Sequence, residues 1–168
     1  MKVSKSLFAI FIFATVFGCK SKVHMVDNKL NGMWKLNKIE TLDNESGNWF
    51  YDSVFTGWTG YIIYDCNGHM GVQITPNGYK DFKANKNPDS LNNDGLKEFV
   101  KFYKSNWVYF ANYFIVENTL EHRRLSATEP KDWGTILTRD YEFREDTLIL
   151  TAHETIGGKK SRLWWVKL

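Results

Sequence analysis

Cysteine and proline are scarce in this sequence, and neither sign of charge dominates it. Two cysteines among 168 residues exclude a small fold held together by a framework of disulfides. With 22 basic against 19 acidic residues the net charge is +3, which gives no bias towards nucleic acid as a partner. The sequence contains no H-E-x-x-H motif, no G-x-S-x-G motif and no glycine-rich phosphate loop, so it predicts no metal and no cofactor.

Aromatic side chains, by contrast, are abundant. They make up 16% of the chain, which excludes a long disordered protein. They also favour strands, because aromatic residues suit a pleated, half-buried surface. The length fits one globular domain and leaves no room for a typical second one.

The first eighteen residues have the features of a secretion signal. Lys2 and Lys5 precede an apolar run of eleven residues, 7–17, which is too short for a transmembrane helix of about 20 residues. The motif V-F-G-C that ends at Cys19 resembles a bacterial lipobox. This resemblance implies a lipoprotein whose signal peptide 1–18 is removed and whose Cys19 carries acyl chains such as palmitate. An ordinary secretory signal with a chance cysteine is the alternative.

The lipobox also predicts where the protein resides and how its chain is divided. The expected location is the bacterial cell envelope, anchored to the outer membrane on its periplasmic or surface side. The mature chain of 150 residues would have a net charge of +1 and one remaining cysteine, Cys66, which excludes an intramolecular disulfide. Residues 19–29 are polar and aperiodic and are predicted to be a lipidated tether, followed by a domain over 30–168.

Eight segments with strand character follow along this domain. Asn67-Gly68 is the strongest turn signal between them, because both residues tolerate the positive φ of a two-residue hairpin loop. Such a loop places Ile63 opposite Val72 and Tyr61 opposite Ile74, on one apolar face. The predicted strands are 33–42, 60–65, 69–75, 108–117, 119–128, 135–144, 147–154 and 161–168.

One amphipathic helix is predicted over about 94–107, between the third and fourth strands. Its apolar stripe runs from Leu96 to Trp107 and is expected to plug or cover one end of the fold. Eight antiparallel strands with short connections predict an all-β fold, a closed up-and-down barrel. An open sandwich is the alternative, but its edges would expose the large apolar residues of the first and last strands.

Several of these segments resemble the bacterial lipocalin-like domain family, a branch of the calycin barrels. The resemblance covers about 30–168, apart from the loop 76–93, and its most specific part is the central hairpin. It implies a small closed barrel that binds an apolar or amphipathic ligand, and it implies no reaction. The segments that carry it are 30–36 (LNGMWKL), the hairpin 60–74, 109–113 (YFANY), 119–122 (TLEH), 134–143 and 148–151 (LILT).

The same resemblance assigns structural roles to residues near the two chain ends. Gly32 opens the first strand, and Trp34 is expected to pack across the base of the barrel. In this family a basic residue from near the chain end covers that tryptophan, and Arg162 or Lys167 could supply it.

His122 and Arg139, which can each carry a positive charge, lie on strand faces expected to point inward. His122 and Arg124 share a face with Leu120, while Arg139 shares one with Leu137. A charge on such a face is costly unless it is paired, so His122 and Arg139 are predicted to bind an anionic or carbonyl group. Alternatively, Arg139 extends to the end of the barrel or pairs with a glutamate. The other candidate ligand-binding residues are Arg124, Tyr113, Tyr61 and Gln73, for each of which ordinary packing is the alternative.

Three functions therefore remain open from the sequence. The first is a membrane-anchored lipoprotein that binds or carries a small apolar or amphipathic ligand. The second is a barrel enzyme, a cyclase or isomerase, in which His122, Arg139 and Tyr113 act as acid, base and oxyanion groups. The third is a non-catalytic structural or interaction module of the envelope, which a barrel without a cavity would favour.

Overall fold

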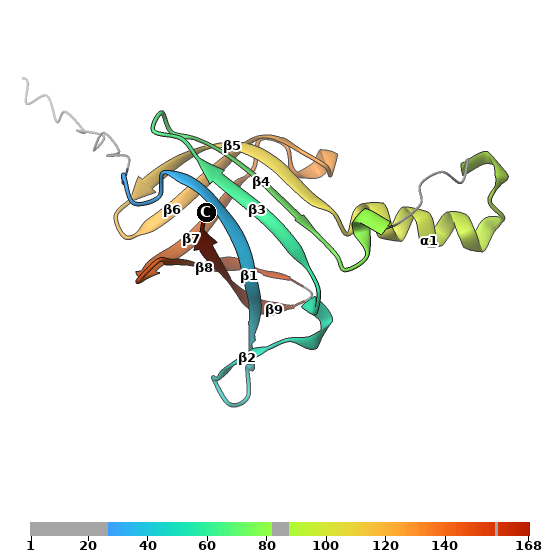
Figure 1. Ribbon diagram of the computed structural model, residues 1–168, viewed down its shortest axis with the longest axis horizontal. Helices are drawn as coiled ribbons and strands as arrows, with labels where there is room; N and C mark the ends of the chain where they lie inside the picture. The colour runs from blue at the N-terminus through green and yellow to red at the C-terminus, as the bar shows by residue number, and fades with distance from the viewer. Residues whose placement is uncertain (1–26, 82–87, 157) are drawn as a thin grey trace, which may run out of the picture.

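The computed structural model describes residues 27–81, 88–156 and 158–168, which form an antiparallel β-barrel (Figure 1). Eight strands follow one another around the barrel in chain order, and the last pairs with the first. This closure confirms the predicted barrel and removes the open sandwich, because β1 and β9 protect each other's edges. The strands are β1 (Gly32–Leu42), β3 (Thr59–Tyr64), β4 (His69–Thr75), β5 (Trp107–Val116), β6 (Thr119–Ala127), β7 (Ile136–Arg144), β8 (Thr147–Ile156) and β9 (Lys159–Lys167).

A further short strand, β2 (Trp49–Tyr51), lies outside this closed set and was not predicted. It pairs with residues 40–42 of β1, beyond the stretch of β1 that pairs with β3. It therefore supplies hydrogen-bond partners to the part of β1 that β3 does not reach. Three residues are too few to show a strand periodicity, which is why the sequence pattern missed it.

The predicted register of the β3–β4 hairpin was wrong by one residue. Ile62, rather than Ile63, pairs with Val72, because the loop contains three residues, 66–68, instead of two. Asp65 stabilises this wider loop: its Oδ1 accepts the backbone N–H of Asn67 at 2.8 Å and of His69 at 2.7 Å. Gly68 takes the left-handed conformation that such a loop needs, with φ 88°.

The shift in register exchanges the two faces of β3. Ile62 and Tyr64 point into the barrel, whereas Tyr61 and Ile63 are 42% and 51% exposed. The core that results is one cluster reaching around the whole barrel. Its buried members are Leu30, Trp34, Leu36, Ile39, Ile62, Tyr64, Met70, Val72, Ile74, Ala111, Tyr113, Leu120, Leu148, Leu150, Leu163 and Trp165.

Trp34 closes one end of the barrel, as the family resemblance implied. The side chain is buried, and its indole N–H donates to the carbonyl of Leu30 at 2.8 Å. The covering cation is Lys167, whose Nζ lies 5.1 Å from the centre of the Trp34 ring. The alternative, Arg162, instead lies over Trp49 and Trp164 and binds Glu40 at 2.6 Å, so its predicted structural role was wrong.

The helix α1 (Asn93–Lys104) lies between β4 and β5 but does not cover the barrel. Figure 1 shows it projecting away from the strands, and none of its residues is buried. Asn92 caps its first turn by accepting the N–H of Gly95 at 2.9 Å, and Trp107 begins β5 instead of extending the helix. The predicted plug or lid was therefore wrong, since an apolar stripe predicts a contact but not its partner.

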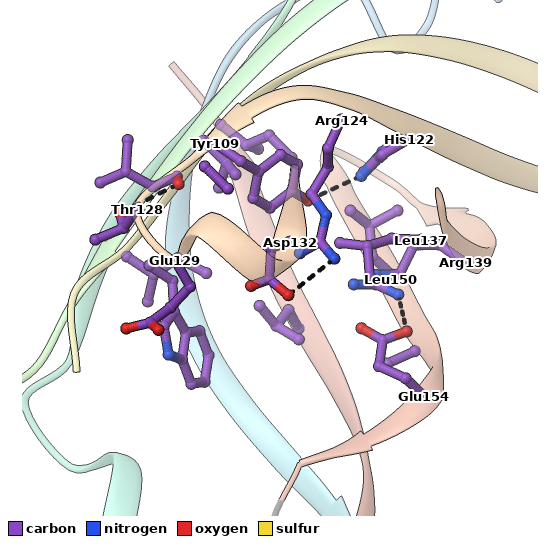
Figure 2. Close-up of a pocket in the computed structure, with 18 of the residues that line it drawn as sticks. Tyr109, His122, Arg124, Thr128, Glu129, Asp132, Leu137, Arg139, Leu150 and Glu154 are labelled. Atoms are coloured by element: carbon purple, nitrogen blue, oxygen red, sulfur yellow. Dashed lines mark hydrogen bonds and ion pairs between the residues drawn. The ribbon is translucent and has the colours of Figure 1, made fainter. Parts of the chain in front are cut away.

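Four short 3₁₀ helices complete the described elements. They are η1 (Ser53–Phe55), η2 (Tyr79–Asp81), η3 (Pro88–Ser90) and η4 (Pro130–Asp132). Of these, η4 matters for the site, because it places Asp132 beside the open end of the barrel (Figure 2). No helix within the described ranges is long and apolar enough to span a membrane.

Candidate functional site

A cavity of about 720 Å³ occupies the barrel and opens at the end opposite Trp34. Strands β3 to β9 all contribute to its wall, and the junction between α1 and β5 lines one side of the entrance. Much of the wall is apolar, from Ile62, Val72, Ile74, Trp107, Val108, Leu137, Leu150, Ala152, Leu163 and Trp165. A cavity of this size with a few polar groups has the usual composition of a small-molecule site.

His122 is the central polar group of this cavity. Strand alternation turns it inward from β6, and it is completely buried. Its Nε2 lies 3.0 Å from the hydroxyl of Tyr64, and its Nδ1 lies 2.9 Å from the hydroxyl of Tyr109. Figure 2 shows the second of these contacts, with Tyr109 reaching across from β5.

These three side chains are uncharged. Burial, reinforced by the positive charge of Arg139, lowers the pKa of His122 to about 3, so the imidazole is neutral at pH 7. Burial also raises the pKa of both Tyr64 and Tyr109, which keeps the phenols protonated. The inner part of the cavity is therefore polar without carrying a charge of its own.

Arg139 lies beside this group on β7 and is only 9% exposed. Its Nη1 forms an ion pair with Glu154 of β8 and donates to the carbonyl of Thr138 at 2.9 Å. The side chain thus lines the cavity, as predicted, and also has the glutamate partner that was the alternative. The pairing compensates the buried charge.

Arg124 lies nearer the entrance. A bulge in β6 leaves Leu125 unpaired opposite β5, so Arg124 and Ala127 both line the cavity in spite of their odd spacing. The Arg124 guanidinium lies 3.3 Å from Asp132 of η4, its Nε donates to Thr135 at 2.8 Å, and it sits over the ring of Tyr109 at 5.9 Å. The other charged residues of the wall are Lys104, Glu129 and Lys131.

The structure does not bring every predicted residue to the cavity. Tyr61 faces outward because of the one-residue shift in the hairpin register, and Gln73 faces outward because it alternates with the inward Val72 and Ile74 of β4. Tyr113 is buried, but its hydroxyl donates to the carbonyl of Asp65 at 2.7 Å, at the hairpin turn, and it does not line the cavity. The trio of His122, Arg139 and Tyr113 that the enzyme hypothesis needs is therefore not assembled there.

Sequence reasoning also missed several contributors. Tyr109 shares the inward face of β5 with Tyr113, so the same alternation could have identified it. Glu154 and Asp132 are polar residues on segments with no distinctive motif, and only the fold places them beside the two arginines. Within the described ranges, no group of three or more metal-ligating side chains is present.

Two buried polar atoms of the wall have no hydrogen-bond partner among the described residues. They are the indole Nε1 of Trp165, on β9, and Oδ1 of Asn106, at the junction of α1 and β5. The amide nitrogen of Asn106 is satisfied by the hydroxyl of Tyr79 at 3.0 Å. Orphaned buried atoms are uncommon in folded proteins, and because a water molecule does not reach either atom, neither offers a hydrogen bond to an occupant of the cavity in this conformation.

A closed up-and-down barrel with an apolar cavity open at one end defines a class of small ligand-binding barrels. The comparisons agree with this class. The model of the lipocalin-like domain family matches residues 31–168, and the chain belongs to that family.

The chain is also similar to a solved structure, that of a mutant of the fluorescent protein UnaG. The two share 16% identity, the match covers 83% of this chain and 96% of the other, and the TM-score is 0.39. At that level the likeness adds nothing to the family assignment. No curated protein matches the chain significantly.

Proposed function

We propose that the barrel binds a small apolar or amphipathic molecule inside its cavity. The observation that carries this proposal is the cavity itself, about 720 Å³ with a largely apolar wall. Volumes of this order enclose ligands of drug or lipid-fragment size, and removing their apolar surface from water favours binding by about 25 cal/mol per Å². The family assignment supports the same reading, because closed barrels of eight strands have room for one small ligand.

Titration with N-phenyl-1-naphthylamine tests this proposal, because the dye fluoresces when it leaves water for an apolar site. We expect saturable fluorescence enhancement with the wild-type protein. Leu137→Trp, which adds bulk to the cavity wall, should abolish it. Ile63→Trp makes a similar change on the outer face and should leave the titration unchanged. Absence of enhancement, or equal binding by both variants, would show that the cavity is not the site.

We also propose that the protein is anchored to the bacterial envelope through acylated Cys19. Support comes from the sequence: a basic start, an apolar run of eleven residues and the lipobox-like V-F-G-C, all of which lie outside the described residues. Metabolic labelling with an alkyne analogue of palmitate tests it in bacterial cells. Cys19→Ala should lose both the label and the membrane association. Cys66→Ala removes an exposed free cysteine and should keep both. Label retained after Cys19→Ala would refute acylation at this site.

A further inference from the structure

The hydrogen bonds around His122 can be assigned by counting protons. A neutral imidazole carries one N–H donor and one bare nitrogen acceptor. Because each nitrogen contacts one tyrosine hydroxyl, one tyrosine must donate to His122 and the other must accept from it. The tyrosine that accepts keeps its own O–H proton free for a different acceptor.

The surroundings of the two tyrosines decide between these arrangements. Tyr64 is 1% exposed and does not line the cavity, and no described residue other than His122 accepts its proton. If Tyr64 were the accepting partner, its O–H would be buried without a hydrogen bond, which is costly. Tyr64 therefore donates to Nε2, the imidazole proton lies on Nδ1, and Nδ1–H donates to the oxygen of Tyr109.

This arrangement leaves the O–H of Tyr109 without an acceptor among the described residues, on a side chain that lines the cavity. A further donor group lies in the same wall. Both hydrogen bonds of Arg139 start from Nη1, so the other guanidinium N–H groups of Arg139 have no hydrogen-bond partner among the described residues.

We propose that the ligand carries a hydrogen-bond-accepting oxygen, of a carbonyl or a carboxylate, that the hydroxyl of Tyr109 binds. Tyr64 and His122 act as positioning residues, which orient the Tyr109 proton into the cavity before the ligand arrives. The inference rests on the proposed function, because it assigns the polar end of a ligand held in the same cavity. It also explains why a histidine is buried among apolar side chains in a neutral form.

Displacement of N-phenyl-1-naphthylamine by three ligands with one ring system tests the inference. Fluorene has no hydrogen-bond-accepting oxygen, 9-fluorenone has a neutral carbonyl oxygen, and fluorene-9-carboxylate has an anionic carboxylate. With the wild-type protein, at least one oxygen-bearing ligand should displace the dye better than fluorene does. Tyr109→Phe should reduce that preference by about three- to tenfold, the usual effect of one hydrogen bond. The ligand whose preference over fluorene falls more in Tyr109→Phe identifies the oxygen that Tyr109 binds, as that of a carbonyl or of a carboxylate.

The matched control is Tyr61→Phe, which removes the same hydroxyl from the outer face and should leave every preference unchanged. If the dye binds and Tyr109→Phe keeps the wild-type preferences, this inference fails while the proposed function stands. If the dye does not bind, both fail.

A second measurement reads the position of the proton directly in the wild-type protein and needs a variant only to assign the signal. Nitrogen-15 NMR of the histidine side chains at pH 7 reports which ring nitrogen carries the proton, with His122→Gln assigning the signal. We expect the proton of His122 on Nδ1. A proton on Nε2, or a doubly protonated ring, would overturn the proposed orientation.

Discussion

Acidification should destabilise this protein through His122, even before its carboxylates are protonated. Burial lowers the pKa of the imidazole to about 3 in the folded protein, whereas an unfolded histidine has a pKa of about 6.5. The unfolded chain therefore binds a proton first, and stability falls as the pH drops from about 6.5 towards about 3. Between pH 7 and pH 5 the expected loss from His122 is about 2 kcal/mol.

The assay is urea unfolding at pH 7 and pH 5, followed by tryptophan fluorescence, on the wild type and on His122→Gln. Glutamine can donate to one tyrosine and accept from the other, but it does not titrate. Its unfolding free energy should fall by about 2 kcal/mol less than that of the wild type over this interval. Tyr64→Phe is the control, because it weakens the same site and keeps the imidazole, so its pH dependence should remain. Equal losses for wild type and His122→Gln would refute the reasoning.

Three further predictions concern the ends and the wall of the barrel. Lys167→Met should lower the unfolding free energy by about 0.5–1 kcal/mol, because the contact with Trp34 is lost. Lys35→Met removes an exposed lysine from the same sheet and should leave the unfolding free energy unchanged. Equal effects of the two changes would argue against the contact. Glu154→Leu should lower the unfolding free energy by about 2 kcal/mol in the same urea assay, because it leaves the buried Arg139 unpaired; the partial exposure of Glu154 keeps the loss this small. Adding Arg139→Met should recover much of that loss, because it removes the unpaired charge. The double change Leu96→Gln and Val100→Gln should alter stability by less than about 0.5 kcal/mol, since both side chains of α1 are 42% exposed; a larger loss would mean that the helix packs on the barrel.

Much of the architecture could be predicted from local patterns. The eight strands of the barrel, their order and the place of the helix follow from alternation, from turn residues and from the family-like motifs, and the structure confirms them. Short connections leave antiparallel neighbours little choice of partner, so strand order is nearly a local property. His122 and Arg139 were also predicted to face inward, because on each strand their spacing matches that of apolar residues that enter the core.

The errors have separate causes. Whether Tyr61 or Ile62 faces inward depends on whether the hairpin loop has two or three residues, and the side chain of Asp65 decides that by capping the loop. A change of one residue moves every side chain of β3 to the other face, so a small local uncertainty made Tyr61 a wrong site residue. Gln73 was wrong for another reason, because it alternates with Val72 and Ile74, the inward residues of β4. The predicted lid failed because an amphipathic stripe does not specify what it packs against.

The sequence alone was sufficient for the class of fold, the closure of the barrel and the inward position of the two key residues, because these depend on periodicity and on neighbours along the chain. The tertiary structure decided the chemistry of the cavity. Tyr64 and Tyr109 reach the two nitrogens of His122 from β3 and β5, and Glu154 reaches Arg139 from β8. Side-chain contacts between different strands depend on register and on the curvature of the closed sheet, and no local pattern encodes either of them.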